Sequence, residues 1–296
     1  MKDFKEIFNK SCIISPKRDQ RPFIGEKDTT CPFCLENSSQ LERSILEIWD
    51  EDKLYMKIVP NKYPITCDNY TPGVHDVIID TESHTLSPKD FTTKHWHQLM
   101  RGLKKRWDDI TDDNDIQFIQ IFKNFGVNAG ASISHSHWQI IALKEIPYTV
   151  LQSFKNYKDD GCYLCNNIDK GITIYEDDYF TVWVPSIPEF VYEVWIVPKL
   201  HHSNYGEFQD EELDKLGDNL KRVLEAYDII EPGAAYNIGF ITGDVKHKYD
   251  YHFYVRIVMR RGNIAGFELA TNCRILSISQ EEYANLLKRA IISLEQ

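Results

Sequence analysis

Two short cysteine pairs, CPFC at residues 31–34 and CYLC at residues 162–165, organise the sequence. A C-x-x-C pair holds two thiolates on one tight turn, which supplies half of a tetrahedral zinc site. Each pair is followed by two histidines that lie 51 residues apart in both halves of the chain. The repeated spacing predicts two Cys2His2 zinc sites per chain that act as structural clips. The expected ligands are Cys31, Cys34, His84 and His135 in the first half, and Cys162, Cys165, His201 and His252 in the second.

A lone C-x-x-C pair is also typical of a thioredoxin-like redox motif, which requires a strand before the pair and a helix start after it. CPFC follows a charged loop at residues 25–30 instead. The chain has seven cysteines, and an odd number argues against a disulfide framework. Metal binding is therefore the favoured interpretation. For the second site, the alternative is a relic of duplication that has lost its metal.

The segments between these ligands also correspond in the two halves. In each half, two apolar strand segments precede the first expected histidine ligand, which is His84 or His201. A helix follows this histidine, and two more strands complete the unit. We therefore predict an α+β fold of two duplicated halves, each a mostly antiparallel sheet with a helix and a zinc clip. The boundary is expected near Pro147, with an N-terminal half at 1–147 and a C-terminal half at 148–296. The expected strands are 53–59, 75–80, 115–122 and 135–143, then 178–185, 192–198, 236–242 and 251–258.

Helix boundaries are indicated by capping residues. Ser87 is the expected cap of the first helix, with Pro88 in its first position. The second helix is expected from about Asp210, and the last opens with a capping box from Ser279 to Glu282.

Composition limits the classes of partner. Asp and Glu number 45 against 34 Lys and Arg, giving a net charge of −11, which disfavours non-specific binding to nucleic acid. No apolar run approaches the roughly 18 residues that span a bilayer. The N-terminal stretch MKDFKEIF is charged and lacks the apolar region of a signal peptide. We expect a cytoplasmic protein without a membrane-spanning segment, and a small phosphorylated ligand remains compatible with its charge.

The residues with the clearest chemistry lie in NFGVNAGASISHSHWQI, at 124–140. Its small residues let backbone N–H groups approach an anion closely. Residues two apart in a strand share a face, so His135, His137 and Gln139 are expected to point the same way. A neutral imidazole at His137 can attack phosphorus held by the loop, and Gln139 can donate to a phosphate oxygen.

The second half lacks this pair of histidines. Its matching face carries His252, Tyr254 and Arg256, which keeps the expected metal ligand without a second imidazole. We therefore expect one catalytic half and one structural half.

Several stretches together resemble the galactose-1-phosphate uridylyltransferase family of the histidine-triad superfamily. The resemblance runs in order from about residue 12 to the C-terminus, and the HxHxQ segment with its glycine–serine lead-in is its most specific part. The matching stretches are SPKRDQRPF (15–23), CPFC (31–34), NKYP (61–64), GVHDVIIDTESH (73–84), GASISHSHWQ (130–139), VPKLHH (197–202) and GFELATN (266–272).

This resemblance implies histidine-triad-like halves and transfer of a nucleoside monophosphate through a covalent nucleotidyl-histidine. His137 would be the nucleophile, with Gln139 and Ser132 on the transferred phosphate. It also implies substrate contacts from Arg18, Arg21, Asn61, Asn124, Phe267 and Glu268. Nucleotide-sugar and sugar-1-phosphate or phosphate would be its ligands, and a homodimer would be a compatible assembly.

Two residues depart from the family pattern. Ser136 stands where uridylyltransferases usually have Pro, and Trp138 stands where the family usually has a small residue. The serine form resembles the ADP-glucose phosphorylase-like branch. UDP-glucose–hexose-1-phosphate uridylyltransferase is thus the leading expectation, and ADP-glucose phosphorylase or a histidine-triad nucleotide hydrolase is the alternative. A binding module without turnover is disfavoured by the intact pair of His137 and Gln139.

Overall fold

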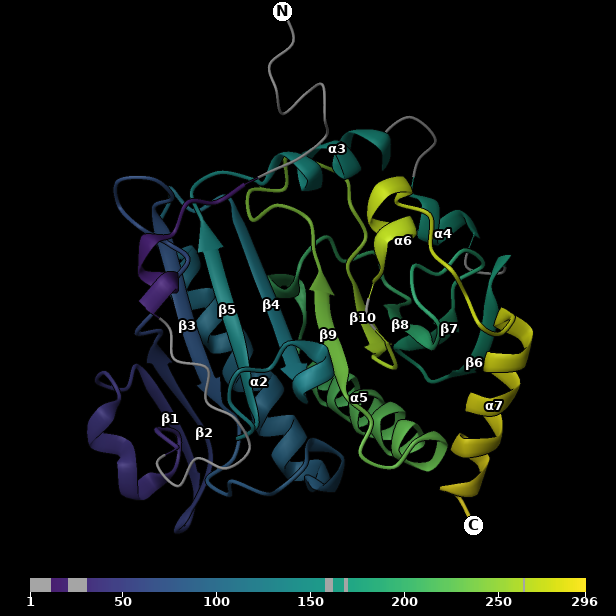
Figure 1. Ribbon diagram of the computed structural model, residues 1–296, viewed down its shortest axis with the longest axis horizontal. Helices are drawn as coiled ribbons and strands as arrows, with labels where there is room; N and C mark the ends of the chain where they lie inside the picture. The colour runs from purple at the N-terminus through teal and green to yellow at the C-terminus, as the bar shows by residue number, and fades with distance from the viewer. Residues whose placement is uncertain (1–11, 21–30, 158–161, 168–169, 263) are drawn as a thin grey trace, which may run out of the picture.

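The computed structural model describes residues 12–20, 31–157, 162–167, 170–262 and 264–296, and it contains a ten-stranded antiparallel sheet (Figure 1). Its strands are β1 (Leu46–Asp50), β2 (Lys53–Pro60), β3 (Gly73–Ile79), β4 (Phe118–Phe125), β5 (His137–Leu143), β6 (Ile172–Glu176), β7 (Phe180–Val184), β8 (Glu193–Pro198), β9 (Tyr236–Ile241) and β10 (Tyr254–Met259). The order across the sheet is β1-β2-β3-β5-β4-β9-β10-β8-β7-β6, so the strand order of the second half mirrors that of the first. β4 and β9 pair at the centre and join the halves. The predicted α+β fold with duplicated halves is confirmed.

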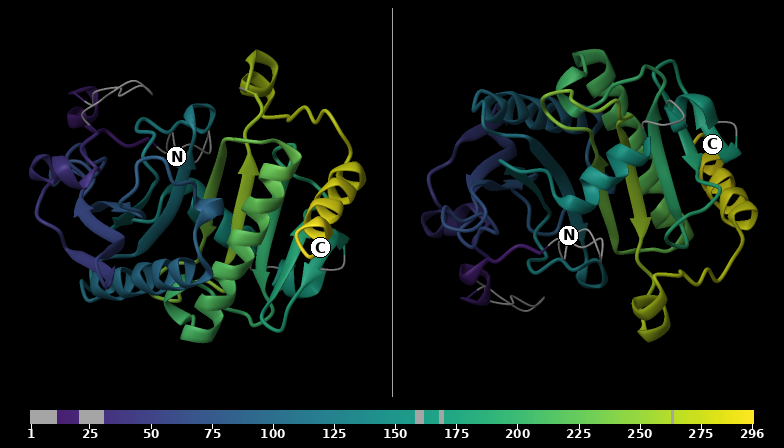
Figure 2. Two further views of the ribbon diagram at one scale, coloured as in Figure 1. Left: turned by 90° about the horizontal axis from the view of Figure 1, so that it is seen from below. Right: turned by 90° about the horizontal axis from the view of Figure 1, so that it is seen from above.

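Two long helices cover one face of this sheet. α2 (Thr93–Thr111) and α5 (Asp210–Ile230) pack against each other behind the strands as drawn in Figure 1, and Figure 2 gives the view along the sheet. The main core lies between helices and sheet and includes Trp96, Leu216 and Trp138. The other helices are α3 (Tyr148–Tyr157), α4 (Tyr163–Asn167), α6 (Gly266–Thr271) and α7 (Gln280–Ser293), with short 3-10 segments η1 (Pro16–Gln20), η2 (Leu35–Gln40), η3 (Pro88–Asp90), η4 (Val127–Ala129) and η6 (Tyr205–Glu207). In the part of the chain that the structure describes, we find no helix with the length and apolarity to cross a bilayer.

The side chains of strand β5 alternate between the main core and the opposite face of the sheet, where His137 lies. Trp138 and Ile140 belong to the main core under α2 and α5. Ile141 instead joins a separate cluster with Phe154 of α3. Because side chains alternate along a strand, His137 shares the face of Ile141, which is opposite the long helices.

The first long helix begins later than predicted. Ser87 precedes η3, a single turn, and its side chain makes no capping hydrogen bond. The α2 helix starts after Thr92, whose hydroxyl accepts a hydrogen bond from the backbone N–H of His95. The chain is extended again at Phe91, so the turn that Pro88 opens cannot continue into the helix. The start of α5 at Asp210 and the capping box at Ser279 are confirmed.

Other sequence expectations need correction. Strands β1 and β6 at the sheet edges were not predicted, and β4 lies three residues later than expected. His135 and His252 lie two positions before the first residues of β5 and β10 rather than in these strands. His95 of α2, in contrast to the solvent-facing side of this helix, is fully buried, with Nε2 at 2.8 Å from the carbonyl oxygen of Asp80. Burial lowers the pKa of His95.

The Thr92→Ala variant tests the observed start of α2. Removal of the hydroxyl that accepts from the His95 N–H should lower the free energy of unfolding by about 1 kcal/mol. Chemical denaturation followed by circular dichroism measures this difference. Ser87→Ala is the matched control and should change it by less than about 0.5 kcal/mol. The reverse ranking would mean that the helix begins where the sequence pattern placed it.

Candidate active site and metal centres

His137 opens strand β5 and is 4% exposed. Its Nδ1 lies 2.9 Å from the carbonyl oxygen of His135. A carbonyl oxygen can only accept a hydrogen bond, so Nδ1 carries the proton and Nε2 is the basic nitrogen of the neutral ring. The ring of Phe33 contacts His137 edge-on, with centroids 5.2 Å apart. This geometry fixes the tautomer that a nucleophilic Nε2 requires.

Gln139, two residues further along β5, is bonded to His75 of β3. The backbone N–H of Ile65 donates to His75 Nδ1 at 2.9 Å, so the proton of the neutral ring is on Nε2. That nitrogen lies 3.0 Å from Oε1 of Gln139, which therefore accepts from it. The amide nitrogen of Gln139 consequently turns away from His75, and it remains a donor. His75 therefore orients the expected phosphate-binding amide.

The NKYP loop lies beside this pair. The amide nitrogen of Asn61 lies 3.1 Å from His75 Nε2 without a hydrogen bond between them, since both nitrogens carry protons, and the side-chain oxygen of Asn61 accepts from the N–H of Tyr63. The carbonyl oxygen of Tyr63 also accepts a hydrogen bond from Arg18 at 3.4 Å. Arg18, Asn61 and Gln139 are thus connected through short contacts. Arg21, the other arginine expected here, lies outside the described residues.

The loop before β5 is held by the second half of the chain. Asn237 of β9 donates through Nδ2 to Oδ1 of Asn124 at 2.8 Å and to the carbonyl of Ala129 at 2.9 Å. Gly126 has a φ of 82° and lies so close to the neighbouring β9 segment that a Cβ atom would approach Ala235 to 2.8 Å. Ser132 in the same loop is buried. The β4–β9 junction therefore supports the expected phosphate loop.

Phe267 and Glu268 are not brought to His137. They lie on α6, which Figure 1 places over the C-terminal half of the sheet. Phe267 is 58% exposed, and Glu268 accepts from the backbone N–H groups of Ala265 and Ile275. Their expected contact with substrate stays a prediction.

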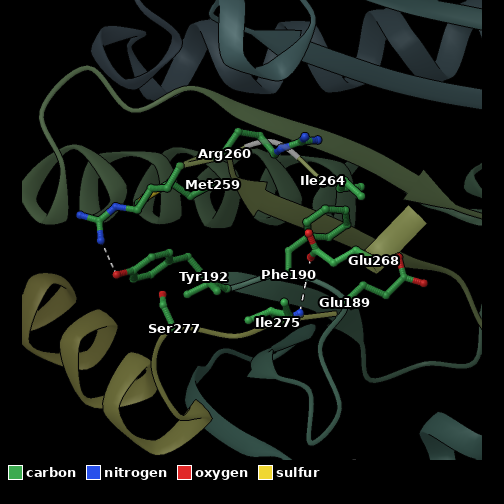
Figure 3. A pocket seen from close by; sticks show the side chains of 12 residues that line it. Glu189, Phe190, Tyr192, Met259, Arg260, Ile264, Glu268, Ile275 and Ser277 are labelled. Atoms are coloured by element: carbon green, nitrogen blue, oxygen red, sulfur yellow. Dashed lines mark hydrogen bonds between the residues drawn. The ribbon is translucent and has the colours of Figure 1, made fainter. Parts of the chain in front are cut away.

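A cavity beside α6 includes Glu268 but neither His137 nor Gln139. Its volume is about 380 Å³, and Figure 3 shows Phe190, Tyr192 and Arg260 around it. The Arg260 guanidinium stacks over Phe190 at 5.2 Å and donates to Asn237, the residue that holds the phosphate loop. The cavity is separate from the expected catalytic face and is connected to it through one asparagine.

The first predicted metal set comes together at the start of β5. The four ligand atoms, from Cys31, Cys34, His84 and His135, lie within 4.8 Å of one another. Sγ of Cys34 is 3.4 Å from Nδ1 of His84 and 3.7 Å from Nδ1 of His135. The other nitrogen of His135, Nε2, lies 2.8 Å from the carbonyl of Thr81. Hydrogen bonding at Nε2 leaves Nδ1 directed at the thiols, as in metal-binding histidines.

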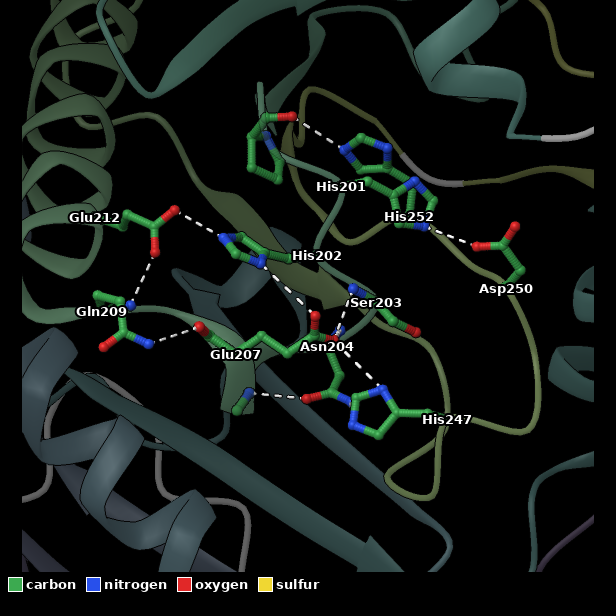
Figure 4. Close-up of polar contacts among 12 residues, drawn as sticks. His201, His202, Ser203, Asn204, Glu207, Gln209, Glu212, His247, Asp250 and His252 are labelled. Carbon is green, nitrogen blue, oxygen red and sulfur yellow. Dashed lines mark hydrogen bonds and ion pairs between the residues drawn. The ribbon is translucent and has the colours of Figure 1, made fainter.

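The second predicted set forms in the same way. Cys162, Cys165, His201 and His252 also have their ligand atoms within 4.8 Å of one another. Nδ1 of His252 is 3.3 Å from Sγ of Cys162, and its Nε2 is 3.0 Å from the carbonyl of Pro198 (Figure 4). Nε2 of His201 lies 2.9 Å from Asp250. In both clusters, the last histidine is therefore hydrogen-bonded through Nε2 to a backbone carbonyl oxygen, and its Nδ1 faces the thiols.

Both clusters fit a thiophilic divalent cation. With Zn–S near 2.3 Å and Zn–N near 2.0 Å, tetrahedral ligand atoms are separated by roughly 3.5 Å. The sulfur–nitrogen contacts of the two clusters are 3.3 to 3.7 Å long. Burial and the neighbouring Cys31 raise the pKa of Cys34 to about 11, and burial and Cys162 raise that of Cys165 to about 11. Two crowded thiols therefore resist ionisation without a cation. A bound metal would stabilise the thiolates.

The second half has no counterpart of His137. Tyr254 and Arg256 occupy the matching positions, two and four residues after His252. Tyr254 packs on Trp195 with centroids 4.3 Å apart, and Arg256 pairs with Glu189 at 3.1 Å. The Cys2His2 cluster is therefore duplicated, whereas the histidine at the position of His137 is not.

Comparisons with known proteins agree with this geometry. Residues 13–146 match a family described as the N-terminal domain of a domain of unknown function, DUF4931. An ADP-glucose phosphorylase from Arabidopsis thaliana is 28% identical, covering 97% of this chain and 92% of that protein. A galactose-1-phosphate uridylyltransferase from Thermotoga maritima is 26% identical, covering 81% of each.

Solved structures show the same relationship. The crystal structure of the Arabidopsis thaliana ADP-glucose phosphorylase with bound ADP-glucose has a TM-score of 0.81 and 29% identity, with 93% of each chain covered. A uridylyltransferase structure has a TM-score of 0.79 at 24% identity, over 95% of each chain, which supports the fold. Over most of its length the chain is therefore similar to ADP-glucose phosphorylase and to galactose-1-phosphate uridylyltransferases, and it has the fold of their solved structures.

Proposed function

We propose that this protein is a nucleotidyltransferase that moves a nucleoside monophosphate from a nucleotide-sugar to phosphate or a sugar-1-phosphate through His137. The observation that carries the proposal is the hydrogen bond from His137 Nδ1 to the carbonyl of His135, at 2.9 Å. It leaves the Nε2 lone pair as the nucleophile. Homology to the galactose-1-phosphate uridylyltransferases and to ADP-glucose phosphorylase supports the same reaction class.

The reaction divides into two balanced steps. The Nε2 lone pair of His137 attacks the α-phosphorus, and the bond from phosphorus to the bridging oxygen breaks, so its electron pair leaves with the sugar-1-phosphate. An oxyanion of the acceptor then attacks the same phosphorus, and the P–N electron pair returns to Nε2. The Nδ1 proton stays on His137 throughout. Gln139 donates its amide N–H to a phosphate oxygen as negative charge shifts in each transition state.

For the substrate pair, we propose ADP-glucose and phosphate. The ADP-glucose phosphorylase matches 97% of this chain, against 81% for the Thermotoga maritima uridylyltransferase. The Ser136 form of the histidine segment favours the same branch. UDP-glucose with a hexose-1-phosphate, the leading expectation from the sequence, is the second candidate because the uridylyltransferase relatives share the HxHxQ chemistry.

We also propose that each Cys2His2 cluster holds one zinc ion with a structural role. The first would be held by Cys31, Cys34, His84 and His135, and the second by Cys162, Cys165, His201 and His252. Zinc has no redox chemistry in such a site and cross-links the chain. At the first site it would also fix His135, whose carbonyl oxygen sets the tautomer of His137.

Formation of the covalent intermediate is the first test. Incubation with ADP-glucose and, separately, UDP-glucose should give a nucleotidyl adduct detectable by intact-protein mass spectrometry, with the adenylyl adduct forming faster. His137→Gly should abolish the adduct because the nucleophile is absent. His247→Gly is the matched control, since His247 has a φ of 53° that glycine adopts readily, and should retain it. An adduct that persists in His137→Gly would place the nucleophile elsewhere.

Metal content is the second test. Elemental analysis of the purified protein should give close to two zinc ions per chain. Cys165→Ser should lose one equivalent and stability while retaining most of the adduct formation, whereas Cys34→Ser should lose one equivalent and both properties. Freshly purified protein with under about half an equivalent of metal would rule out zinc clips.

The contact between His75 and Gln139 gives a third test. Gln139→Ala should reduce kcat about a hundredfold because a transition-state donor is lost. His75→Ala should reduce kcat about tenfold by releasing the Gln139 amide. In the double variant the two losses should not add, and the coupling energy should be about 1 kcal/mol or more. Additive losses would show that His75 does not act through Gln139.

A further inference from the structure

A fully buried ion pair lies directly behind the nucleophile. Lys123 of β4 and Asp80, the residue after β3, are both 0% exposed. Nζ of Lys123 lies 2.7 Å from Oδ2 of Asp80, 2.7 Å from Oγ of Ser136 and 3.2 Å from the carbonyl oxygen of His137. An ammonium group has three N–H donors, and these three acceptors can use all of them.

Asp80 and the next residue, Thr81, bind the two residues that flank Ser136 and His137. Oδ2 of Asp80 accepts a hydrogen bond from the indole N–H of Trp138 at 2.9 Å. The next residue, Thr81, accepts from His135 through its carbonyl oxygen at 2.8 Å. Each of the four consecutive residues 135–138 is therefore bonded to Lys123 or to the Asp80–Thr81 segment. These residues carry both the expected metal ligand and the nucleophile.

Stability alone does not account for such a pair. Burial opposes the ionisation of Asp80, but the adjacent Lys123 ammonium holds the pKa of this carboxyl below its usual range. Burial lowers the pKa of Lys123. A buried ion pair is often replaced by apolar residues with no loss of stability, because desolvation offsets the attraction between the charges. What an apolar pair could not provide is the set of directional hydrogen bonds to residues 136–138.

The direction of these bonds points to a role in orientation. Trp138 packs into the helix-side core, so the pair contacts β5 from behind while the His137 imidazole faces the opposite side. The pair fixes the carbonyl of His137 and the side chains of its two neighbours. The position of the His135 carbonyl, and with it the His137 tautomer, depends on the same short segment.

We propose that Lys123 and Asp80 are positioning residues that hold residues 135–138 so that His137 presents Nε2 to the substrate phosphorus, a proposal that rests on nucleotidyl transfer at His137. Ser136 and Trp138, the two departures from the uridylyltransferase pattern, are the side chains through which the pair acts. In this account Trp138 is a hydrogen-bond donor to the pair as well as a packing residue.

The test separates positioning from stability with two variants. Lys123→Met leaves Asp80 buried without its cation and should be strongly destabilised. Lys123→Met/Asp80→Asn removes both charges, keeps an acceptor for Trp138, and should regain most of the melting temperature. The double variant still lacks the bonds from Nζ to Ser136 and His137. Its rate of adduct formation with ADP-glucose should fall at least tenfold, with unchanged zinc content and less than a twofold change in KM.

A matched control uses the other carboxylate on the helix side of β3. Asp76 is bonded to Nε of Arg106 at 2.9 Å and is also buried, but its partner on β5 is Ile140, outside residues 135–138. Arg106→Met/Asp76→Asn removes a comparable pair. It should leave the adduct rate within twofold of the wild type.

A second readout does not depend on turnover. Nitrogen NMR of histidine-labelled protein, with His137 assigned by its absence in His137→Gly, should show a single Nδ1-protonated tautomer in the wild type and a mixture in the double variant. Wild-type adduct rate and tautomer in the double variant would overturn the positioning role while leaving the proposed function intact. If no adduct forms even in the wild type, the proposed function fails, and the NMR comparison alone decides the role of the pair.

Discussion

The hydrogen bond between the His137 ring and the carbonyl of His135 is the interaction on which the proposed chemistry depends. Because Nδ1 of His137 donates to this carbonyl oxygen, the proton of the neutral ring is on Nδ1 and the lone pair is on Nε2. The ring of His135 has two contacts of its own. Its Nδ1 lies in the first Cys2His2 cluster, and its Nε2 is hydrogen-bonded to the carbonyl oxygen of Thr81. The expected metal ligand His135 and the proposed nucleophile His137 are thus two positions apart in the chain, so a metal that fixed His135 would also orient His137.

The two halves share one architecture, but the proposed transfer site lies in the first half alone. Both halves keep the Cys2His2 cluster and place its last histidine just before a strand. In the second half, Tyr254 and Arg256 are used in packing and ion pairing where the first half has His137 and Gln139. The second half nevertheless supports the site, because Asn237 of β9 holds the loop that precedes His137. Through the pairing of β4 with β9, both halves of the chain therefore hold the proposed site in place.

Sequence patterns predicted the parts of this molecule that depend on spacing or alternation. The eight expected ligands come together in two clusters, as their repeated spacing predicts. The start of α2 was missed because Ser87–Pro88 is a good capping signal that serves only a single turn. His75 and Lys123 could not be assigned, since their roles come from partners 64 and 43 residues away. The distant position of Phe267 and Glu268 likewise depends on tertiary structure.

The most direct test of the central claim is a crystal structure of the protein trapped after reaction with ADP-glucose. The account predicts continuous density between the α-phosphorus and Nε2 of His137, with Nδ1 still hydrogen-bonded to the carbonyl of His135 and the Gln139 amide nitrogen on a phosphate oxygen. Phosphorus bonded to Nδ1 of His137, or to any other side chain, would contradict it.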